Sequence, residues 1–124
     1  LSSVNKVNKD IKKFNLEIIK SNIINKTSKI GIIGLSFKKG SDDVRETPSY
    51  YYIKKMLELG YKNIFAYDEI AIKSFKKNYP KLKIKYCETV TEILKKTSHI
   101  ILLTNIKNFK KFNNKKIIDL KYQT

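Results

Sequence analysis

The sequence is poor in cysteine, histidine, proline and tryptophan. Its 124 residues include one Cys, one His, two Pro and no Trp. The lone Cys87 cannot form an internal disulfide, and Cys87 with His99 cannot supply the four ligands of a structural zinc ion. Two Pro and four Gly are too few for a collagen-like or low-complexity chain. These shortages exclude a disulfide scaffold, a zinc finger and a fibre.

Long apolar runs are also missing. The run from Ile100 to Leu103 has only four residues, whereas a membrane-spanning helix needs ~18. No basic, apolar and small-residue succession marks a signal peptide at the N-terminus. With 41% hydrophobic residues, one domain can still bury a core. We therefore expect a cytoplasmic protein and, because the chain begins with Leu1 and stops at Thr124, a piece of a longer one.

Acidic residues and arginine are scarce beside lysine. Lys and Arg number 27 against 11 acids, a net charge of +16, and 26 of the 27 are Lys. Such a charge is typical of proteins that bind nucleic acid or another polyanion. However, the lysines are spread along the whole chain without the Arg that bidentate recognition favours. We favour a solvated lysine-rich surface and keep a non-catalytic, basic polyanion-binding module as the alternative.

The single arginine, Arg45, is informative for the same reason. In a chain that otherwise uses Lys, it marks a position where a planar, forked and permanently charged donor is needed.

Apolar residues near the N-terminus recur at spacings of three and four. They are Val4, Val7, Ile11, Phe14 and Ile18. This spacing predicts an amphipathic helix with one narrow apolar seam, followed by a linker over 25–28. Because the helix alone has nothing to cover its seam, we expect it to pack on another domain or on a second copy. A calmodulin target or a membrane-surface helix is the alternative.

The rest of the chain alternates strands with helices. We expect strands over 29–37, 63–67, 83–86, 99–104 and 116–120, and helices over 48–60, 70–79, 89–96 and, as a short helix or turn, 108–112. Thr47 and Thr89 are the predicted N-caps, and Gly60 is the predicted C-terminal cap. The alternation predicts a Rossmann-like three-layer α/β sandwich with a five-stranded parallel sheet, preceded by a long amphipathic helix.

The connection after the first strand is the predicted place of a binding site. It runs from Ser36 to Pro48, where two to six residues are usual, and ligands of such folds bind beyond the carboxyl ends of the strands. Lys38 and Lys39, just ahead of a helix N-terminus, predict an anion site. Phe37 either lies against a base or sugar or packs in the core.

Acidic residues share this connection with the arginine. Asp42, Asp43 and Glu46 flank Arg45 and either hold the cations in place or act as general bases. We favour the first interpretation.

Other candidate residues have plainer interpretations. Gly31 and Gly34 do not have the spacing of the dinucleotide fingerprint, so a full NAD site is not expected here, and they are assigned to close helix-to-sheet approach. Cys87 has no activating partner nearby and is predicted to be a buried apolar residue. His99 is predicted to be a structural or surface residue. An acidic phosphorylation site is excluded because Glu88, not Asp, follows the third strand.

The segment GLSFKKGSDDVRETP over residues 34–48 resembles the G-L-x-F-K-x-x-T-D-D-x-R-E-S-P segment of the UDP-glucose/GDP-mannose dehydrogenase family. That segment opens the family's C-terminal, nucleotide-sugar-binding domain. The A-Y-D of residues 66–68 and the strand over 101–104 also resemble family segments. The helix over 1–27 resembles the end of the family's central domain, which leaves 28–124 as the C-terminal domain.

The resemblance implies a parent enzyme that oxidises the C6 alcohol of a nucleotide sugar to a carboxylate, for polysaccharide biosynthesis, and consumes two NAD. It also implies a homodimer formed through the central helix. The family binds NAD on an N-terminal domain and forms a thio-adduct on a central-domain cysteine, which Cys87 does not match. The chain alone is therefore expected to be inactive, with no catalytic residue and no metal.

The resemblance also assigns residues. Phe37 and Lys38 contact the nucleotide sugar, and Arg45 reaches toward the NAD. Lys121 stands where the family's D-G-R has a substrate-binding arginine, and it keeps the charge but loses the fork. The base and the sugar of the substrate stay open.

Overall fold

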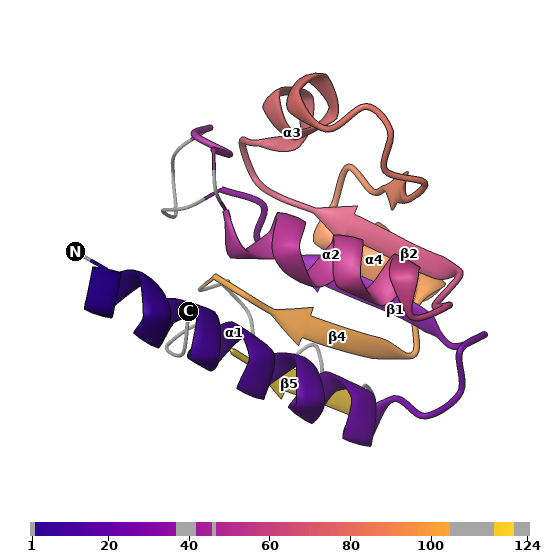
Figure 1. Ribbon diagram of the computed structural model, residues 1–124. Helices are drawn as coiled ribbons and strands as arrows, with labels where there is room; N and C mark the ends of the chain where they lie inside the picture. Colours follow the sequence, from indigo (N-terminus) through magenta and orange to yellow (C-terminus); the bar gives the residue numbers. More distant parts are fainter. Residues whose placement is uncertain (1, 37–41, 46, 105–115, 121–124) are drawn as a thin grey trace.

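The computed structural model describes residues 2–36, 42–45, 47–104 and 116–120, with the backbone alone for 2–9. Its elements are α1 (Ser2–Asn22), β1 (Lys29–Ile33), α2 (Pro48–Glu58), β2 (Asn63–Tyr67), α3 (Ile72–Asn78), β3 (Lys85–Tyr86), α4 (Val90–Lys96), β4 (His99–Leu102) and β5 (Lys116–Asp119). Figure 1 shows α1 and α2 side by side in front of the sheet.

The five strands form one parallel sheet in the order β3-β2-β1-β4-β5. Ile32 of β1 lies opposite Ala66 of β2 and Ile101 of β4, and Ile101 lies opposite Ile118 of β5. The strand order runs one way from β1 to β3 and the other way from β4 to β5. The chain is therefore a doubly wound, Rossmann-like α/β domain, and the predicted fold class is confirmed.

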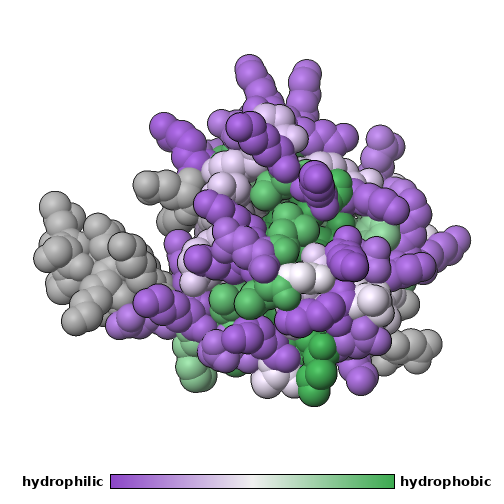
Figure 2. All heavy atoms as spheres, turned by 45° about the vertical axis from the view of Figure 1, so that its right-hand side comes forward, coloured by the Kyte–Doolittle hydropathy of each residue, from purple (hydrophilic) through white to green (hydrophobic). Residues whose placement is uncertain are grey.

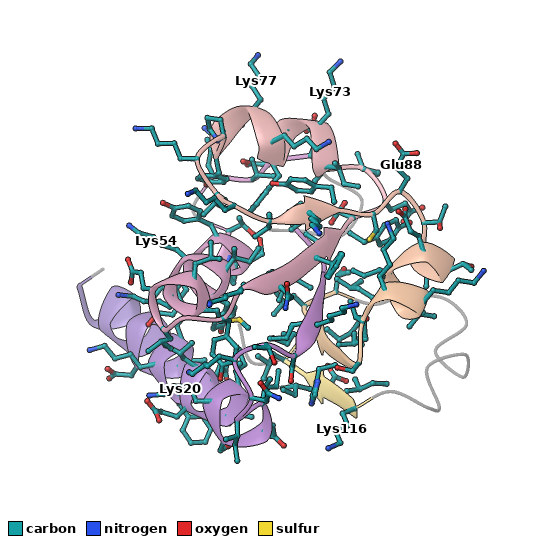
Figure 3. The ribbon with its side chains drawn as sticks, turned by 90° about the vertical axis from the view of Figure 1, so that its right-hand side faces the viewer. Lys20, Lys54, Lys73, Lys77, Glu88 and Lys116 are labelled. Atoms are coloured by element: carbon teal, nitrogen blue, oxygen red, sulfur yellow. The ribbon has the colours of Figure 1, made fainter. Side chains whose placement is uncertain are left out.

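Helices cover the sheet on both faces (Figure 3). Alternate strand residues such as Ile32 and Ala66 share a core with Ile19 of α1, Tyr52 of α2 and Phe75 of α3. The residues between them face the other way, into a second core around Ile93 of α4. The buried residues of this core are Ile33, Phe65, Cys87, Ile93, Ile100 and Leu102. This alternation follows from the two-residue period of a strand.

The caps of α2 and α4 follow the predictions in part. At the end of α2, Gly60 has φ +100°, and the N–H groups of Gly60 and Tyr61 donate to the carbonyls of Leu57 and Met56 at 3.1 and 3.0 Å. This is the expected glycine C-cap. Thr89 accepts from the Glu92 N–H at 3.0 Å, as predicted.

Thr47 is the N-cap of α2 and is followed by Pro48, as predicted. Its backbone is extended, as an N-cap requires, but its side chain makes no cap hydrogen bond, and its hydroxyl instead lies 3.1 Å from the Ser49 hydroxyl. Both side chains are buried.

Strands β1 and β4 are shorter than predicted. β1 ends at Ile33 because Gly34, with φ +111°, leaves the extended conformation, and β4 ends at Leu102. The ladder still continues for one residue, since Leu103 N–H donates to the Ile33 carbonyl at 2.8 Å. The predicted helix or turn over 108–112 lies outside the described residues.

Helix α1 packs on the domain through a face that includes Ile18 of the predicted seam but is centred on Asn15 and Ile19. Asn15, Ile19 and Ile23 are buried, whereas Phe14 is 64% exposed. The Asn15 amide donates to the Tyr52 hydroxyl at 3.0 Å. The spacing of apolar residues does not predict this face, because Asn15 at its centre is polar. The hydrogen bond to Tyr52 compensates the cost of burying the Asn15 amide. Part of α1 thus packs on the rest of the chain, whereas Phe14 of the predicted seam stays largely exposed, and the expected cover by another domain or a second copy stays a prediction.

Candidate functional site

The strand order reverses between β1 and β4, and the backbones meet closely at their carboxyl ends. A Cβ at Gly34 would lie 3.1 Å from the Thr104 Cβ and from the Thr104 backbone nitrogen, and the φ of +111° disfavours any other residue. The predicted role of this glycine in helix packing is corrected, since it lets the chain beyond β1 pass the end of β4. The role is confirmed at Gly31, where a Cβ would lie 3.0 Å from Ile93 of α4.

Asp68, just beyond β2, ties the connection after β1 to the start of α3. Its Oδ2 accepts from the Leu35 N–H at 2.8 Å, and its Oδ1 accepts from the Ile70 and Ala71 N–H groups at 2.8 Å each. In dinucleotide-binding domains an acidic residue in this region binds the cofactor's ribose. Here the carboxylate is engaged by the domain's own backbone, which fits the missing glycine fingerprint. Sequence reasoning missed this anchoring role, although an Asp at a strand end before a helix is a usable signal.

The carbonyl of Leu35 is held as firmly as its N–H group. The buried Ser49 hydroxyl, in the first turn of α2, donates to it at 3.2 Å. The chain that enters the long connection is thus fixed from β2 on one side and from α2 on the other.

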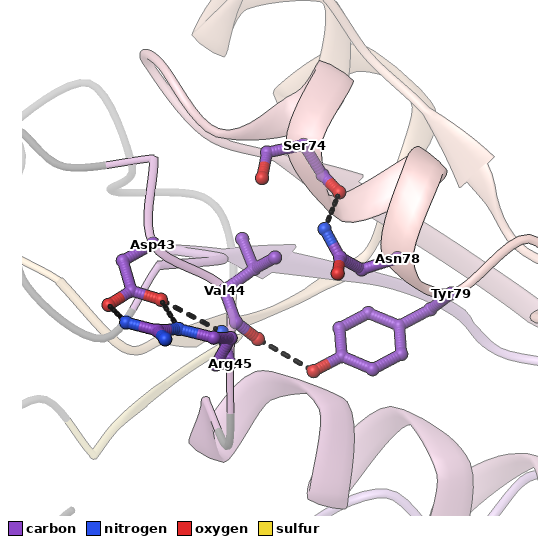
Figure 4. A network of polar contacts seen from close by, with 6 residues as sticks. All are labelled: Asp43, Val44, Arg45, Ser74, Asn78 and Tyr79. Carbon is purple, nitrogen blue, oxygen red and sulfur yellow. Dashed lines mark hydrogen bonds and ion pairs between the residues drawn. The ribbon is translucent and has the colours of Figure 1, made fainter.

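Arg45 and Asp43 form a forked ion pair at the far end of the same connection (Figure 4). Arg45 Nε donates to Asp43 Oδ1 and Arg45 Nη2 donates to Asp43 Oδ2, both at 3.1 Å, and the Arg45 backbone N–H donates to Oδ1 at 3.1 Å. The hydrogen bond from the guanidinium is the main cause that lowers the pKa of Asp43. The predicted pairing of an acid with Arg45 is confirmed for Asp43. A paired carboxylate with a lowered pKa is poorly suited to general-base work.

The Arg45 side chain is 83% exposed, so a ligand can approach it from solvent. Phe37, Lys38, Lys39, Glu46 and Lys121 lie outside the described residues. Of the predicted substrate and cofactor residues, the structure therefore places Arg45, at the carboxyl edge of the sheet beside the start of α2.

Cys87 and His99 have the predicted structural character. Cys87 is fully buried, and burial raises the pKa of its thiol, which keeps it protonated at neutral pH. His99 is half-buried, with Nδ1 3.0 Å from the Ser98 hydroxyl. Burial, and secondarily the charge of Lys116, lowers the pKa of His99. Among the described residues no three His, Cys, Asp or Glu side chains are grouped to hold a metal ion.

The described lysines do not gather into one patch. Figure 2 shows hydrophilic side chains spread over the whole visible face with small apolar areas between them. In Figure 3, Lys73 and Lys77 project together from α3, whereas Lys20, Lys54 and Lys116 project from α1, α2 and β5 in other directions. No helix within the described residues is long and apolar enough to cross a membrane.

A doubly wound parallel sheet, with polar anchors gathered beyond its β1 and β2 ends, defines a Rossmann-like α/β domain. Residues 31–124 match the model of the UDP-glucose/GDP-mannose dehydrogenase family, UDP binding domain, and the chain belongs to that family.

Relatives with curated names agree. The chain is 33% identical over 97 residues to the UDP-glucose 6-dehydrogenase of Rickettsia felis, covering 77% of this chain and 21% of the relative. It is 36% identical over 83 residues to UDP-glucose 6-dehydrogenase YwqF of Bacillus subtilis, covering 67% and 18%. The chain thus spans about a fifth of the length of these relatives.

Solved structures share the fold. A UDP-glucose dehydrogenase from Pyrobaculum islandicum superposes with a TM-score of 0.80 at 20% identity, over 99% of this chain and 29% of that one. A GDP-mannose dehydrogenase from Pseudomonas aeruginosa, solved as a ternary complex, superposes with a TM-score of 0.77 at 23% identity, over 96% and 30%.

Proposed function

We propose that this chain is the substrate-nucleotide-binding domain of a cytoplasmic, NAD-dependent nucleotide-sugar 6-dehydrogenase. The observation that carries the proposal is the match of residues 31–124 to the family's UDP binding domain. The names of the curated relatives make UDP-glucose the first substrate to test.

The proposed reaction oxidises the sugar's C6 alcohol to a carboxylate in two steps. One alcohol, two NAD⁺ and one water give one carboxylate, two NADH and three H⁺. NAD⁺, when bound, accepts the hydride in each step. This chain neither carries the dinucleotide fingerprint nor offers an accessible thiol, because Cys87 is buried. Its proposed part is to bind the nucleotide of the substrate and to present one cation to the cofactor.

Each proposed binding residue has a chemistry that suits its role. Lys38 and Lys121 would hold the substrate diphosphate as point charges, and Phe37 would lie against its base or sugar. Arg45 would donate through its fork to an oxygen of the NAD held by another domain. The exposure of the Arg45 side chain supports that assignment, because the cofactor must come from outside this domain.

The first experiment is NADH formation by the full-length enzyme offered UDP-glucose, UDP-N-acetyl sugars and GDP-mannose in turn. Turnover with UDP-glucose is expected. Arg45→Lys should raise KM for NAD by about tenfold, since the fork is lost while the charge remains. Turnover with none of the sugars would overturn the proposal.

A paired substitution separates binding from general charge. Lys38→Ala should raise KM for UDP-glucose, whereas Lys77→Ala, which removes an equal charge from an exposed position on α3, should not. Equal effects of the two variants would show that only the overall charge matters and would contradict the assignment of Lys38 to the substrate. The polyanion-binding alternative predicts a footprint of contacts on DNA in addition to salt-sensitive retention.

We also propose that the outer face of α1 is covered by a second copy in the intact enzyme. The resemblance of this helix to the end of the family's central domain suggests the second copy, and the 64% exposure of Phe14 leaves its ring accessible to one. Phe14→Glu should shift the full-length enzyme from dimer to monomer in light scattering coupled to size-exclusion chromatography. A dimer of unchanged mass would contradict it.

A further inference from the structure

Tyr79 reaches from the end of α3 into the connection that carries Arg45. Its hydroxyl donates to the Val44 carbonyl at 2.6 Å (Figure 4). Its ring stacks on Tyr50 of α2, with centroids 4.1 Å apart and an interplanar angle of 19°, and lies 4.9 Å from the ring of Phe75. Two helices therefore fix the position of this hydroxyl.

Val44 is held on both of its sides. Its side chain is 2% exposed and belongs to the same core as Phe75 of α3. Its carbonyl accepts from Tyr79. The neighbouring Asp43 and Arg45 project outward and are joined to each other. Val44 is thus the point at which the connection enters the core.

The ion pair alone is too exposed to set the direction of the guanidinium. The side chains are 83% exposed for Arg45 and 45% for Asp43, and pairs in solvent contribute little and are screened by salt. The backbone that carries Arg45 therefore contributes to the direction of the guanidinium. That backbone is fixed at Val44.

We propose that Tyr79 is a positioning residue for Arg45: by binding the Val44 carbonyl, it holds the backbone that aims the Asp43–Arg45 fork at the cofactor. The link to NAD rests on the proposed function, whereas the link from Tyr79 to Arg45 does not. The two links can therefore be tested separately.

The first test needs no cofactor. Arg45 is the only arginine in the sequence, so its Nε–H gives a single identifiable signal in ¹⁵N NMR of this chain. At about pH 5.5 the partner carboxylate stays charged, because the Arg45 fork lowers the pKa of Asp43. Tyr79→Phe keeps the stacked ring and removes the donor. It should raise the rate of solvent exchange of this Nε–H by about tenfold, the scale of one lost hydrogen bond.

Tyr61→Phe is the matched control. The Tyr61 hydroxyl also donates to a backbone carbonyl, that of Ile23, but at the amino end of the sheet. This variant should leave the Arg45 signal unchanged while losing a similar amount of thermal stability. An unchanged signal in Tyr79→Phe, or an equal change in Tyr61→Phe, would overturn the positioning role.

The second test uses the full-length enzyme. Tyr79→Phe should raise KM for NAD by about fivefold with KM for the sugar nucleotide unchanged, and it should add no further increase in an Arg45→Lys background. If Arg45→Lys itself leaves KM for NAD unchanged, the proposed function of Arg45 fails, and the NMR result still decides the positioning role. If Arg45→Lys acts but Tyr79→Phe adds to it independently, the positioning role fails alone.

Discussion

On one face of the sheet, α1, α2 and α3 share a core that includes three large, fully buried aromatic residues, Tyr52, Tyr61 and Phe75. On the other face, the described residues form a core of six, with Ile93 as the buried residue of α4. The first face packs through rings, and the hydroxyl groups of Tyr52 and Tyr61 also form hydrogen bonds with a distant side chain and a distant backbone carbonyl. The second, the aliphatic face, packs mainly through aliphatic side chains, with Phe65 as its buried ring, and Ile93 and Ile100 lie against Gly31.

This difference shows how one sheet can serve two purposes. The aromatic face joins separate segments, since Tyr52 holds α1 through Asn15 and Tyr61 holds the Ile23 carbonyl. Tyr79, packed on the same face, holds Val44. Among the described residues, the buried side chains of the aliphatic face make no comparable hydrogen bonds to distant segments, and this face serves to cover the sheet. Substitutions on the two faces should therefore fail in different ways.

The largest expected effect is the loss of Ile93. Because α4 has this one buried residue, Ile93→Ala should cost about 3 kcal/mol and release α4 locally. Ile53→Ala in α2 should cost a similar amount, but Tyr52 and Met56 should keep that helix folded. Denaturant unfolding with hydrogen exchange of the helix amides measures both. If the amides of α4 in Ile93→Ala are as well protected from exchange as those of α2 in Ile53→Ala, the two faces do not differ in this respect.

The next effect concerns the face of α1 that packs on the domain. Ile19→Ala should cost about 2–3 kcal/mol, because Ile19 is fully buried. Phe14→Ala should change the stability of this chain by less than about 0.5 kcal/mol, because the ring is 64% exposed. The denaturant midpoints of the two variants measure these losses. A larger loss in Phe14→Ala than in Ile19→Ala would show that the predicted seam, and not the face of Ile19, packs on the domain.

A smaller effect is expected where the aliphatic face approaches β1. Gly31→Ala places a Cβ 2.8 Å from Ile100 Cδ1 and 3.0 Å from Ile93 Cγ1, which should cost about 1–2 kcal/mol because both side chains must shift. Adding Ile93→Val should recover part of that loss, although Ile93→Val alone is destabilising. If the stability losses of Gly31→Ala and Ile93→Val in thermal unfolding simply add in the double variant, Ile93 of α4 is not the side chain that the new Cβ contacts.

The smallest effect is a pH dependence from His99. Burial and Lys116 lower its pKa in the folded state, so between the folded and unfolded values the unfolded chain binds more protons. Stability is therefore lost as the pH falls through the unfolded value of about 6.5. The melting temperature should fall between about pH 7.5 and pH 5 by up to about 2 °C more in the wild type than in His99→Gln. A larger fall in the variant would reverse the sign.

Much of the fold could be predicted because it depends on local patterns. The strand over 63–67 was predicted to the residue, and the Gly60 cap is as expected, since each follows from a few neighbouring residues. The predicted ends of β1 and β4 lie beyond the observed ones. In β1 the reason is that apolar residues continue past Gly34, where the backbone leaves the extended conformation. The pairing of Arg45 with an acidic neighbour could also be predicted from the sequence, because Asp43 and Arg45 are only two residues apart.

The sequence by itself determined the alternation of strands and helices, the parallel sheet, the family segment over 34–48 and the singular position of Arg45. The tertiary structure alone decided the contacts that connect distant segments. Those contacts are Asp68 with Leu35, Asn15 with Tyr52, and Tyr79 with Val44. The physical reason is that periodicity and capping act within a turn or two of chain. A polar partner more than 30 residues away is chosen only when the strands set their order and bring the two groups within hydrogen-bonding distance.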